Sequence, residues 1–210
     1  MTVFTDKKVD FQAMQQAAAW KSILPETFRI AVNVSPQQFA RDGFIDSIVA
    51  ALEASGEPAS RLNIEITENV FIHNQEAVSR LLSECKAMGV GVSLDDFGTG
   101  YSSLGYLTRF PLDNLKIDRS FVVRLPSDPT SKVLVKAVIQ LAHSLGLVVV
   151  AEGVETQEQL AHLKAEGCDN IQGYLYSKPV KAEQIPELLL RYRGQAETRA
   201  AEALEPEEIL

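Results

Sequence analysis

The sequence has few cysteines and few histidines for a chain of 210 residues. Cys85 and Cys168 lie far apart, and neither stands in a Cys-x-x-Cys or Cys/His spacing. The histidines, His73, His143 and His162, also lack the spacing of metal ligands. Neither a disulfide scaffold nor a zinc site of the Cys/His type is therefore indicated.

Long apolar runs and basic clusters are also missing. No apolar run approaches the roughly 18 residues that a transmembrane helix needs, and the start of the chain lacks the order of a secretory signal, so we expect a cytoplasmic protein with no membrane partner. The net charge is −8, and no basic stripe is present to neutralise phosphates. We therefore expect no nucleic acid polymer as a partner.

Length and composition predict one folded domain followed by a short tail. With 46% hydrophobic residues, the chain can bury a single core. We place this domain at residues 1–194 and expect an acidic, flexible tail at 195–210. The tail contains one arginine, Arg199, and five acidic residues: Glu197, Glu202, Glu205, Glu207 and Glu208.

Short runs rich in Val, Ile and Leu alternate with segments of helical periodicity. The expected strands are 28–34, 61–67, 90–95, 114–118, 147–152 and 170–176. The expected helices are 11–21, 44–54, 74–88, 102–107, 131–145, 157–166 and 182–192. Repeated β-α-β units indicate parallel strands with right-handed crossovers, in either an open sheet or a barrel.

Every one of these strands has polar residues at or near its carboxyl end: Asn33, Glu65, Asp95 with Asp96, Lys116 with Asp118, Glu152, and Gln172. An open sheet gathers ligand groups at one switch point, whereas a barrel gathers them from all strands on one rim. The pattern thus favours an α/β fold with a TIM-like (β/α) barrel. A complete barrel needs about 250 residues, so we expect an N-terminally incomplete one with about six strands.

The predicted rim is rich in carboxylates, at positions 65, 95, 96 and 152, which repel each other unless they are protonated or bind a cation. Oxygen ligands that include the amide of Asn33 suit Mg²⁺ or Mn²⁺, and two such ions typically cleave phosphoesters. Lys116 could then hold a phosphate oxygen or the attacking water. Two alternatives remain: the acids cap helices or pair with lysines, or Lys116 acts as a Schiff-base nucleophile.

The rim residues lie in six short motifs: Asn33-Val34-Ser35, Glu65-Ile66-Thr67-Glu68, Asp95-Asp96-Phe97-Gly98-Thr99-Gly100-Tyr101-Ser102-Ser103-Leu104, Lys116-Ile117-Asp118, Ala151-Glu152-Gly153-Val154-Glu155-Thr156 and Gln172-Gly173-Tyr174. In order and spacing, over about residues 11–190, these motifs resemble the EAL-domain phosphodiesterases of bacterial cyclic di-GMP signalling. The resemblance implies a triosephosphate-isomerase-like barrel that binds cyclic di-GMP and, with two Mg²⁺ or Mn²⁺ ions, hydrolyses it to linear pGpG.

The resemblance also implies a role for each matching residue. Asn33, Glu65 and Asp95 would hold one ion, and Asp95, Asp96 and Glu152 the other. Lys116 would orient the nucleophilic water, and Glu152 is the candidate base. Glu68 would brace the 95–105 loop region, which lies at the homodimer interface in the family. The remaining ligand and second-shell contacts would come from Asp118, Glu155 and Gln172.

One departure from the family pattern stands at the N-terminus. The strand that carries the Glu-Ala-Leu signature, with its metal-binding Glu and a nearby Arg, has no counterpart upstream of residue 10. We interpret the Glu202-Ala203-Leu204 triplet as coincidence, because no Arg follows and Pro206 interrupts the segment. We therefore expect activity below that of a complete domain, and unpaired edges at strands 28–34 and 170–176 that would invite a partner able to complete the barrel.

Three hypotheses follow from the sequence. The first is a metal-dependent cyclic di-GMP phosphodiesterase with reduced activity. The second is a non-catalytic module that binds the dinucleotide or a regulatory protein. In the third, the chain is a fragment of a longer protein.

Overall fold

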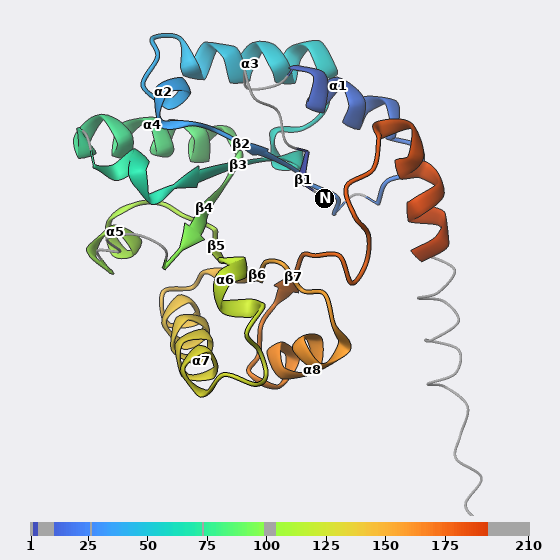
Figure 1. Cartoon of the computed structure of the whole chain (residues 1–210). Coiled ribbons are helices and arrows are strands. Elements are labelled where there is room, and N and C mark those ends of the chain that lie inside the picture. Colours follow the sequence, from blue (N-terminus) through green and yellow to red (C-terminus); the bar gives the residue numbers. More distant parts are fainter. Residues whose placement is uncertain (1, 4–10, 26, 73, 99–103, 193–210) are drawn as a thin grey trace, which may run out of the picture. The chain divides into compact units, whose positions relative to one another are not determined.

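The computed structural model describes residues 2–3, 11–25, 27–72, 74–98 and 104–192 (Figure 1). Contacts divide the chain into two units, residues 1–177 and 178–210, and each is described by itself. Within the described residues, no helix is both long enough and apolar enough to cross a membrane. The expected tail at 195–210 lies outside the described residues, so the domain boundary at 194 stays a prediction.

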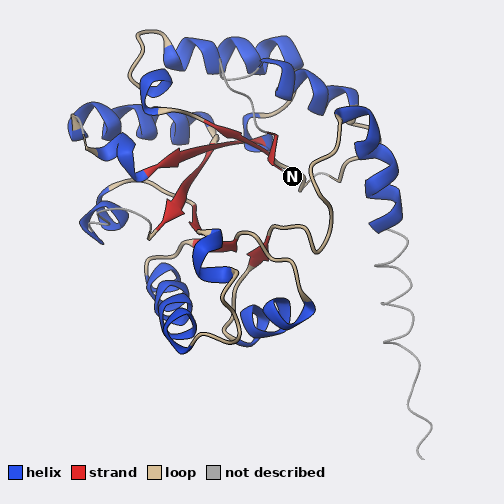
Figure 2. Ribbon diagram, viewed as in Figure 1, coloured by secondary structure: helices blue, strands red, loops and turns tan. Residues whose placement is uncertain are grey.

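The first unit is built on a parallel sheet of seven strands that lie side by side in the order of the sequence. The strands are β1 (Thr2–Val3), β2 (Ile30–Asn33), β3 (Leu62–Thr67), β4 (Gly91–Phe97), β5 (Asn114–Ile117), β6 (Val148–Ala151) and β7 (Asn170–Ile171). The sheet curls, and its helices lie outside the curve (Figure 2). This arrangement confirms the predicted α/β fold with an incomplete TIM-like (β/α) barrel, although the sheet has seven strands where about six were expected.

The helices lie between the strands, as the periodicity predicted. They are α1 (Phe11–Ala19), α2 (Pro36–Phe39), α3 (Phe44–Ser55), α4 (Gln75–Met88), α5 (Leu104–Arg109), α6 (Arg119–Val122), α7 (Pro129–Ser144) and α8 (Gln157–Ala165), with the 3₁₀ turns η1 (Ala59–Arg61) and η2 (Glu68–Phe71). Gly89 ends α4 in the left-handed conformation that favours glycine. In the second unit, η3 (Ala182–Gln184) leads into a helical segment at 185–192.

The two faces of the sheet differ in character. Ile64, Leu94, Leu115 and Val149 are fully or almost fully buried in the apolar core that the outer helices cover. Because side chains alternate along a strand, the residues between them point into the concave side. On β3, β4 and β5 these residues are polar or charged, so polar side chains line the inside of the curve in this part of the sheet.

The strand predictions need two corrections. The edge of strand 28–34 is not left open, because β1 pairs with it in parallel through Thr2↔Ala31 and Val3↔Val32. A strand of two residues is too short to show any periodicity, which explains why the sequence did not predict it. The last strand is also shorter than the expected 170–176, because the hydrogen-bonded ladder with β6 ends at Ile171.

Candidate active site

Lys116 stands at the centre of a cluster of carboxylates on the concave side of the sheet. Its Nζ lies 2.8 Å from Oε2 of Glu65, 2.9 Å from Oδ1 of Asp95 and 2.6 Å from Oε1 of Glu152. The side chains of Lys116 and Glu65 are each only 4% exposed. One ammonium group therefore contacts acids from β3, from β4 and from the end of β6 in a nearly dry environment.

The parallel ladder explains how residues so far apart in sequence meet. Glu65 lies near the end of β3, Lys116 near the end of β5, and Glu152 directly follows β6. All strands run in the same direction, so their carboxyl ends share one rim of the curled sheet. Asn33, the last residue of β2, pairs in register with Glu65 and lies at the same rim.

A bulge in β4 brings two adjacent aspartates to the site. The β4–β5 ladder is regular up to Leu94↔Leu115 and resumes at Phe97↔Ile117, so two residues of β4, Asp95 and Asp96, stand opposite the single residue Lys116 of β5. Asp96 has a φ of 55°, and its N–H donates to Oδ1 of Asp95 at 3.1 Å. Bulges commonly re-aim side chains next to active sites, and this one turns both carboxylates toward the cluster.

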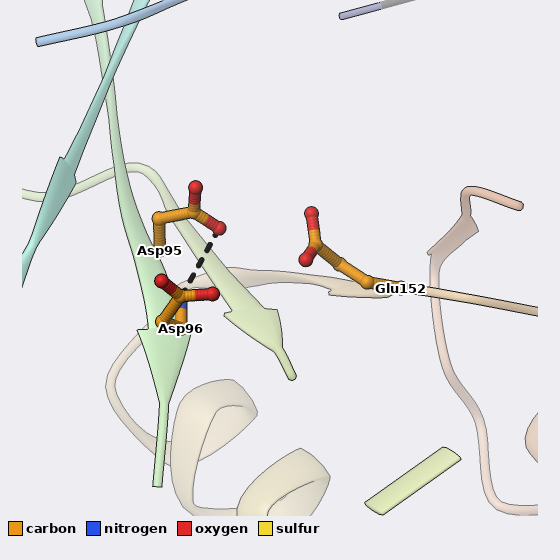
Figure 3. Close-up of side chains that lie close together, drawn as sticks. All are labelled: Asp95, Asp96 and Glu152. Atoms are coloured by element: carbon orange, nitrogen blue, oxygen red, sulfur yellow. Dashed lines mark hydrogen bonds between the residues drawn. The ribbon is translucent and has the colours of Figure 1, made fainter. Parts of the chain in front are cut away.

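Asp95, Asp96 and Glu152 form a group that can hold a metal ion. Each offers a carboxylate oxygen, and the three oxygens lie within 4.8 Å of one another. Figure 3 shows the Glu152 side chain pointing from the segment after β6 toward the two aspartates. Oxygen donors of this kind, without His or Cys, suit a hard cation such as Mg²⁺ or Mn²⁺. The donor set thus fits the predicted cofactor.

Charge in the cluster is unbalanced, because carboxylates outnumber the ammonium four to one. Burial is the main cause that raises the pKa of Glu65 and of Glu152, and repulsion from Asp95 adds to it in both. Burial and Asp95 also raise the pKa of Asp96. The surrounding acids raise the pKa of Lys116 despite its own burial. A charged ammonium is a poor amine nucleophile, which argues against the Schiff-base alternative.

The raised pKa values predict a pH-dependent response to metal. Carboxyls whose pKa is higher in the folded state stabilise it below their unfolded pKa, and that stability is lost as the pH rises through the folded pKa. The metal-free fold should therefore lose stability as the pH rises through the raised pKa values of Glu65, Asp96 and Glu152, and a divalent ion should compensate. Melting temperatures with EDTA and with Mn²⁺ measure this: we expect a larger Mn²⁺ increment at about pH 8 than at about pH 5. Equal increments would contradict the account.

The other predicted residues lie around this centre. Oε1 of Glu68 accepts a hydrogen bond from the N–H of Gly98 at 3.3 Å, which connects η2 to the start of the loop after β4. Residues 99–103 of that loop lie outside the described residues. Asp118 caps α6 by accepting a hydrogen bond from the N–H of Ser120 at 2.9 Å.

The sequence analysis did not identify Arg119, which contacts two other side chains at the outer part of the rim. Its guanidinium lies 2.7 Å from Oε1 of Glu155 and 5.9 Å from the centre of the Tyr174 ring. A Cβ at Gly153 would come within 2.2 Å of Arg119, so only glycine leaves room for it. The charged run Lys116-Ile117-Asp118-Arg119 was the available signal, but nothing in it identified Glu155 as the partner.

Gln172 holds the last rim segment through its backbone. Its N–H donates to the carbonyl of Ala151 at 2.8 Å, and its carbonyl accepts from Val154 at 3.0 Å. At the next residue, a Cβ on Gly173 would lie 2.1 Å from the carbonyl oxygen of Val154. This close approach of two backbone segments explains why residue 173 is a glycine. Together with the two hydrogen bonds, it holds the segment that follows Glu152 in place.

Comparisons with known proteins agree with this geometry. The EAL domain family model matches residues 6–179. Cyclic di-GMP phosphodiesterase NbdA of Pseudomonas aeruginosa is 43% identical over 171 residues, which are 81% of this chain and 22% of that protein. The crystal structure of the EAL domain of Mycobacterium smegmatis DcpA superposes with a TM-score of 0.82 at 40% identity, covering 86% of this chain and 82% of that one.

A further similar solved structure is a ligand complex. The PaMucR phosphodiesterase in its c-di-GMP complex has a TM-score of 0.79 at 42% identity, covering 83% of this chain and 71% of that one. This chain spans about a quarter or less of the length of the first curated relatives it matches. Sequence, fold and the order of the rim residues agree, and the chain belongs to the EAL domain family.

Proposed function

We propose that this chain binds cyclic di-GMP at the carboxyl ends of its strands and hydrolyses one phosphodiester to give linear pGpG. The observation that carries the proposal is the cluster in which Lys116 contacts Glu65, Asp95 and Glu152 while Asp96 lies beside them. Relatives named as cyclic di-GMP phosphodiesterases, and a related structure described as a c-di-GMP complex, support the same substrate.

Two divalent ions, Mg²⁺ or Mn²⁺, would complete the site. Asn33, Glu65 and Asp95 would hold one, and Asp95, Asp96 and Glu152 the other. When bound, such ions neutralise the phosphodiester and lower the pKa of the attacking water. The excess of buried negative charge supports this assignment, because a cation relieves the repulsion that raises the carboxyl pKa values.

The chain's own residues would move the proton and position the substrate. Glu152 would accept the proton of the attacking water, whose oxygen bonds to phosphorus while the bond to the ester oxygen breaks. The leaving ester oxygen would take up a proton from solvent, and Glu152 would return its proton to solvent. Lys116 would orient that water through its charged Nζ. Around them, the ligand and the groups it touches would be held by Asp118, Glu155 and Gln172.

The test is direct. The purified chain, incubated with cyclic di-GMP and Mn²⁺ or Mg²⁺, should form pGpG, EDTA should stop the reaction, and Glu152→Gln should abolish it while the fold is retained. Absence of product at high enzyme concentration, with the fold confirmed by circular dichroism, would contradict the proposal.

A specific observation also favours binding without turnover. The strand beside β2 is β1, and neither Thr2 nor Val3 carries a carboxylate. In the family pattern, a glutamate on an upstream strand completes the first metal site, so activity below that of other EAL domains stays our prediction. Calorimetry with cyclic di-GMP in Ca²⁺ or Mn²⁺, run beside the hydrolysis assay, separates the two functions. Binding with no pGpG would favour the non-catalytic module.

Two finer assignments belong to this proposal. The 95–105 loop region, which Glu68 contacts at Gly98, would form a homodimer interface. Sedimentation velocity tests this: a dimer that Glu68→Ala weakens is expected, and a monomer at all concentrations would contradict it. The cytoplasmic location expected from the sequence also stays a prediction.

A further inference from the structure

A second polar layer lies deeper in the curled sheet, beneath the carboxylate cluster. It consists of Asn63 on β3, Ser93 on β4 and Asn114 on β5. These residues stand two positions before Glu65, Asp95 and Lys116 on the same three strands. Because strand side chains alternate with a period of two, each member of the deeper layer faces the same side as the cluster residue above it.

The three side chains close a triangle of hydrogen bonds. Nδ2 of Asn63 donates to Oγ of Ser93 at 2.7 Å, and Nδ2 of Asn114 donates to the same Oγ at 2.8 Å and to Oδ1 of Asn63 at 3.3 Å. Asn63 and Ser93 are 6% and 2% exposed. The hydroxyl of Ser93 is thus the shared acceptor of two amide groups with almost no access to solvent.

The sheet makes room for this triangle at one position. Gly91 pairs in register with Asn63, and a Cβ on Gly91 would lie 2.7 Å from Oδ1 of Asn63. Real Cβ atoms essentially never come this close to another heavy atom. The glycine on β4 therefore leaves the space that the Asn63 amide fills. The amides fit in this register only, because a slip by one residue would turn them into the apolar core and leave them unpaired.

The triangle lies directly before the bulge that builds the site. Ser93↔Asn114 is the pair next to Leu94↔Leu115, which is the last regular pair before Asp95 and Asp96 leave the ladder. The strands are therefore joined by side-chain bonds at the level where regular pairing is about to stop. The position of Lys116 relative to both aspartates depends on how firmly β4 and β5 are held at that level.

We propose that Asn63, Ser93 and Asn114 are positioning residues that hold the β4 bulge, and thereby the spacing of Glu65, Asp95 and Lys116, for metal binding. The part of this inference that concerns turnover rests on the proposed function, and the part that concerns metal affinity and site geometry does not. Groups that orient metal ligands typically contribute about 10- to 100-fold to metal affinity or activity.

Ser93→Ala tests the inference, because it removes the shared acceptor with the smallest change in volume. We expect Mn²⁺ affinity, measured by calorimetry, to fall about 10- to 100-fold, and kcat for cyclic di-GMP to fall in parallel with little change in KM. Ser93→Thr retains the hydroxyl and should restore most of the affinity.

A matched control separates positioning from general loosening of the fold. Ser131 is also 2% exposed, and its hydroxyl donates to Asp128 at 2.6 Å at the start of α7, far from the cluster in sequence. Ser131→Ala should lower the melting temperature and leave Mn²⁺ affinity unchanged. Equal weakening of Mn²⁺ binding in both alanine variants, or wild-type affinity in Ser93→Ala, would overturn the inference.

A metal-free readout keeps this test independent of the proposed function. In a crystal structure of metal-free Ser93→Ala, we expect the contact between Nζ of Lys116 and Oδ1 of Asp95, 2.9 Å in the wild type, to lengthen beyond hydrogen-bond range. An unchanged contact would overturn the inference even if the wild type hydrolyses cyclic di-GMP. If wild-type protein forms no pGpG while Ser93→Ala shows the lengthened contact, the proposed function fails and the inference stands.

Discussion

Replacing Lys116 with methionine should destabilise the metal-free protein and remove most of its activity. The substitution leaves Glu65, Asp95 and Glu152 without the ammonium that contacts all three. Removing one partner of a buried ion pair typically costs about 3–5 kcal/mol, and the loss of a preorganised charge at a reacting centre lowers kcat about 100- to 1,000-fold. Urea unfolding in EDTA and the pGpG assay measure the two effects.

Lys86→Met is the matched control for this prediction. Lys86 also forms an ion pair, with Asp113, but the two side chains are 36% and 29% exposed. Pairs of this kind contribute about 0–1 kcal/mol, so the free energy of unfolding should change little and turnover should stay at the wild-type level. If the Lys116→Met protein is as stable and as active as Lys86→Met, Lys116 is not needed to stabilise the three acids or to support turnover, and the prediction is wrong.

Asp95→Asn should separate function from stability. Asp95 is shared between the two proposed ion sites, and it contacts both Lys116 and the backbone of Asp96. The amide oxygen of asparagine can still accept from Lys116, so the free energy of unfolding without metal should change by no more than about 1 kcal/mol. Loss of the carboxylate should lower Mn²⁺ affinity and turnover by at least about 100-fold, because a direct ligand contributes more than the groups that orient it.

The control is the same change at a carboxylate outside the cluster. Asp128 accepts hydrogen bonds from the N–H groups of Thr130 and Ser131 at the start of α7. Asparagine is also a good N-cap, and this side chain lies outside the cluster, so Asp128→Asn should leave turnover at the wild-type level. Turnover in Asp95→Asn close to that of Asp128→Asn would show that Asp95 is not a metal ligand.

The position of the site could be predicted from the sequence because it follows from strand direction alone. Parallel strands deliver their last residues to one rim, so the polar groups at residues 33, 65, 95, 116 and 152 had to lie near each other once the strands were identified. The helix that ends at Gly89 was equally clear, because its periodicity and its left-handed cap agree.

What the sequence could not predict depends on contacts across the sheet. Nothing local indicates that Lys116 contacts three acids at once, that β4 bulges at Asp95, or that Arg119 pairs with Glu155. Strand β1 was missed because two residues carry no pattern, and its pairing with β2 is fixed only by the folded sheet. The triangle of Asn63, Ser93 and Asn114 was hidden for the same reason: each residue alone resembles an ordinary polar position in a strand.

The central claim is that oxygen groups from separate strands hold divalent ions together, and anomalous diffraction from a crystal soaked in Mn²⁺ tests it most directly. We expect manganese peaks at the cluster, one in contact with Asp95, Asp96 and Glu152 and one in contact with Asn33, Glu65 and Asp95, at the roughly 2.0–2.6 Å typical of oxygen ligands. A crystal in which manganese occupies other sites while Lys116 keeps its three acid partners would contradict the account.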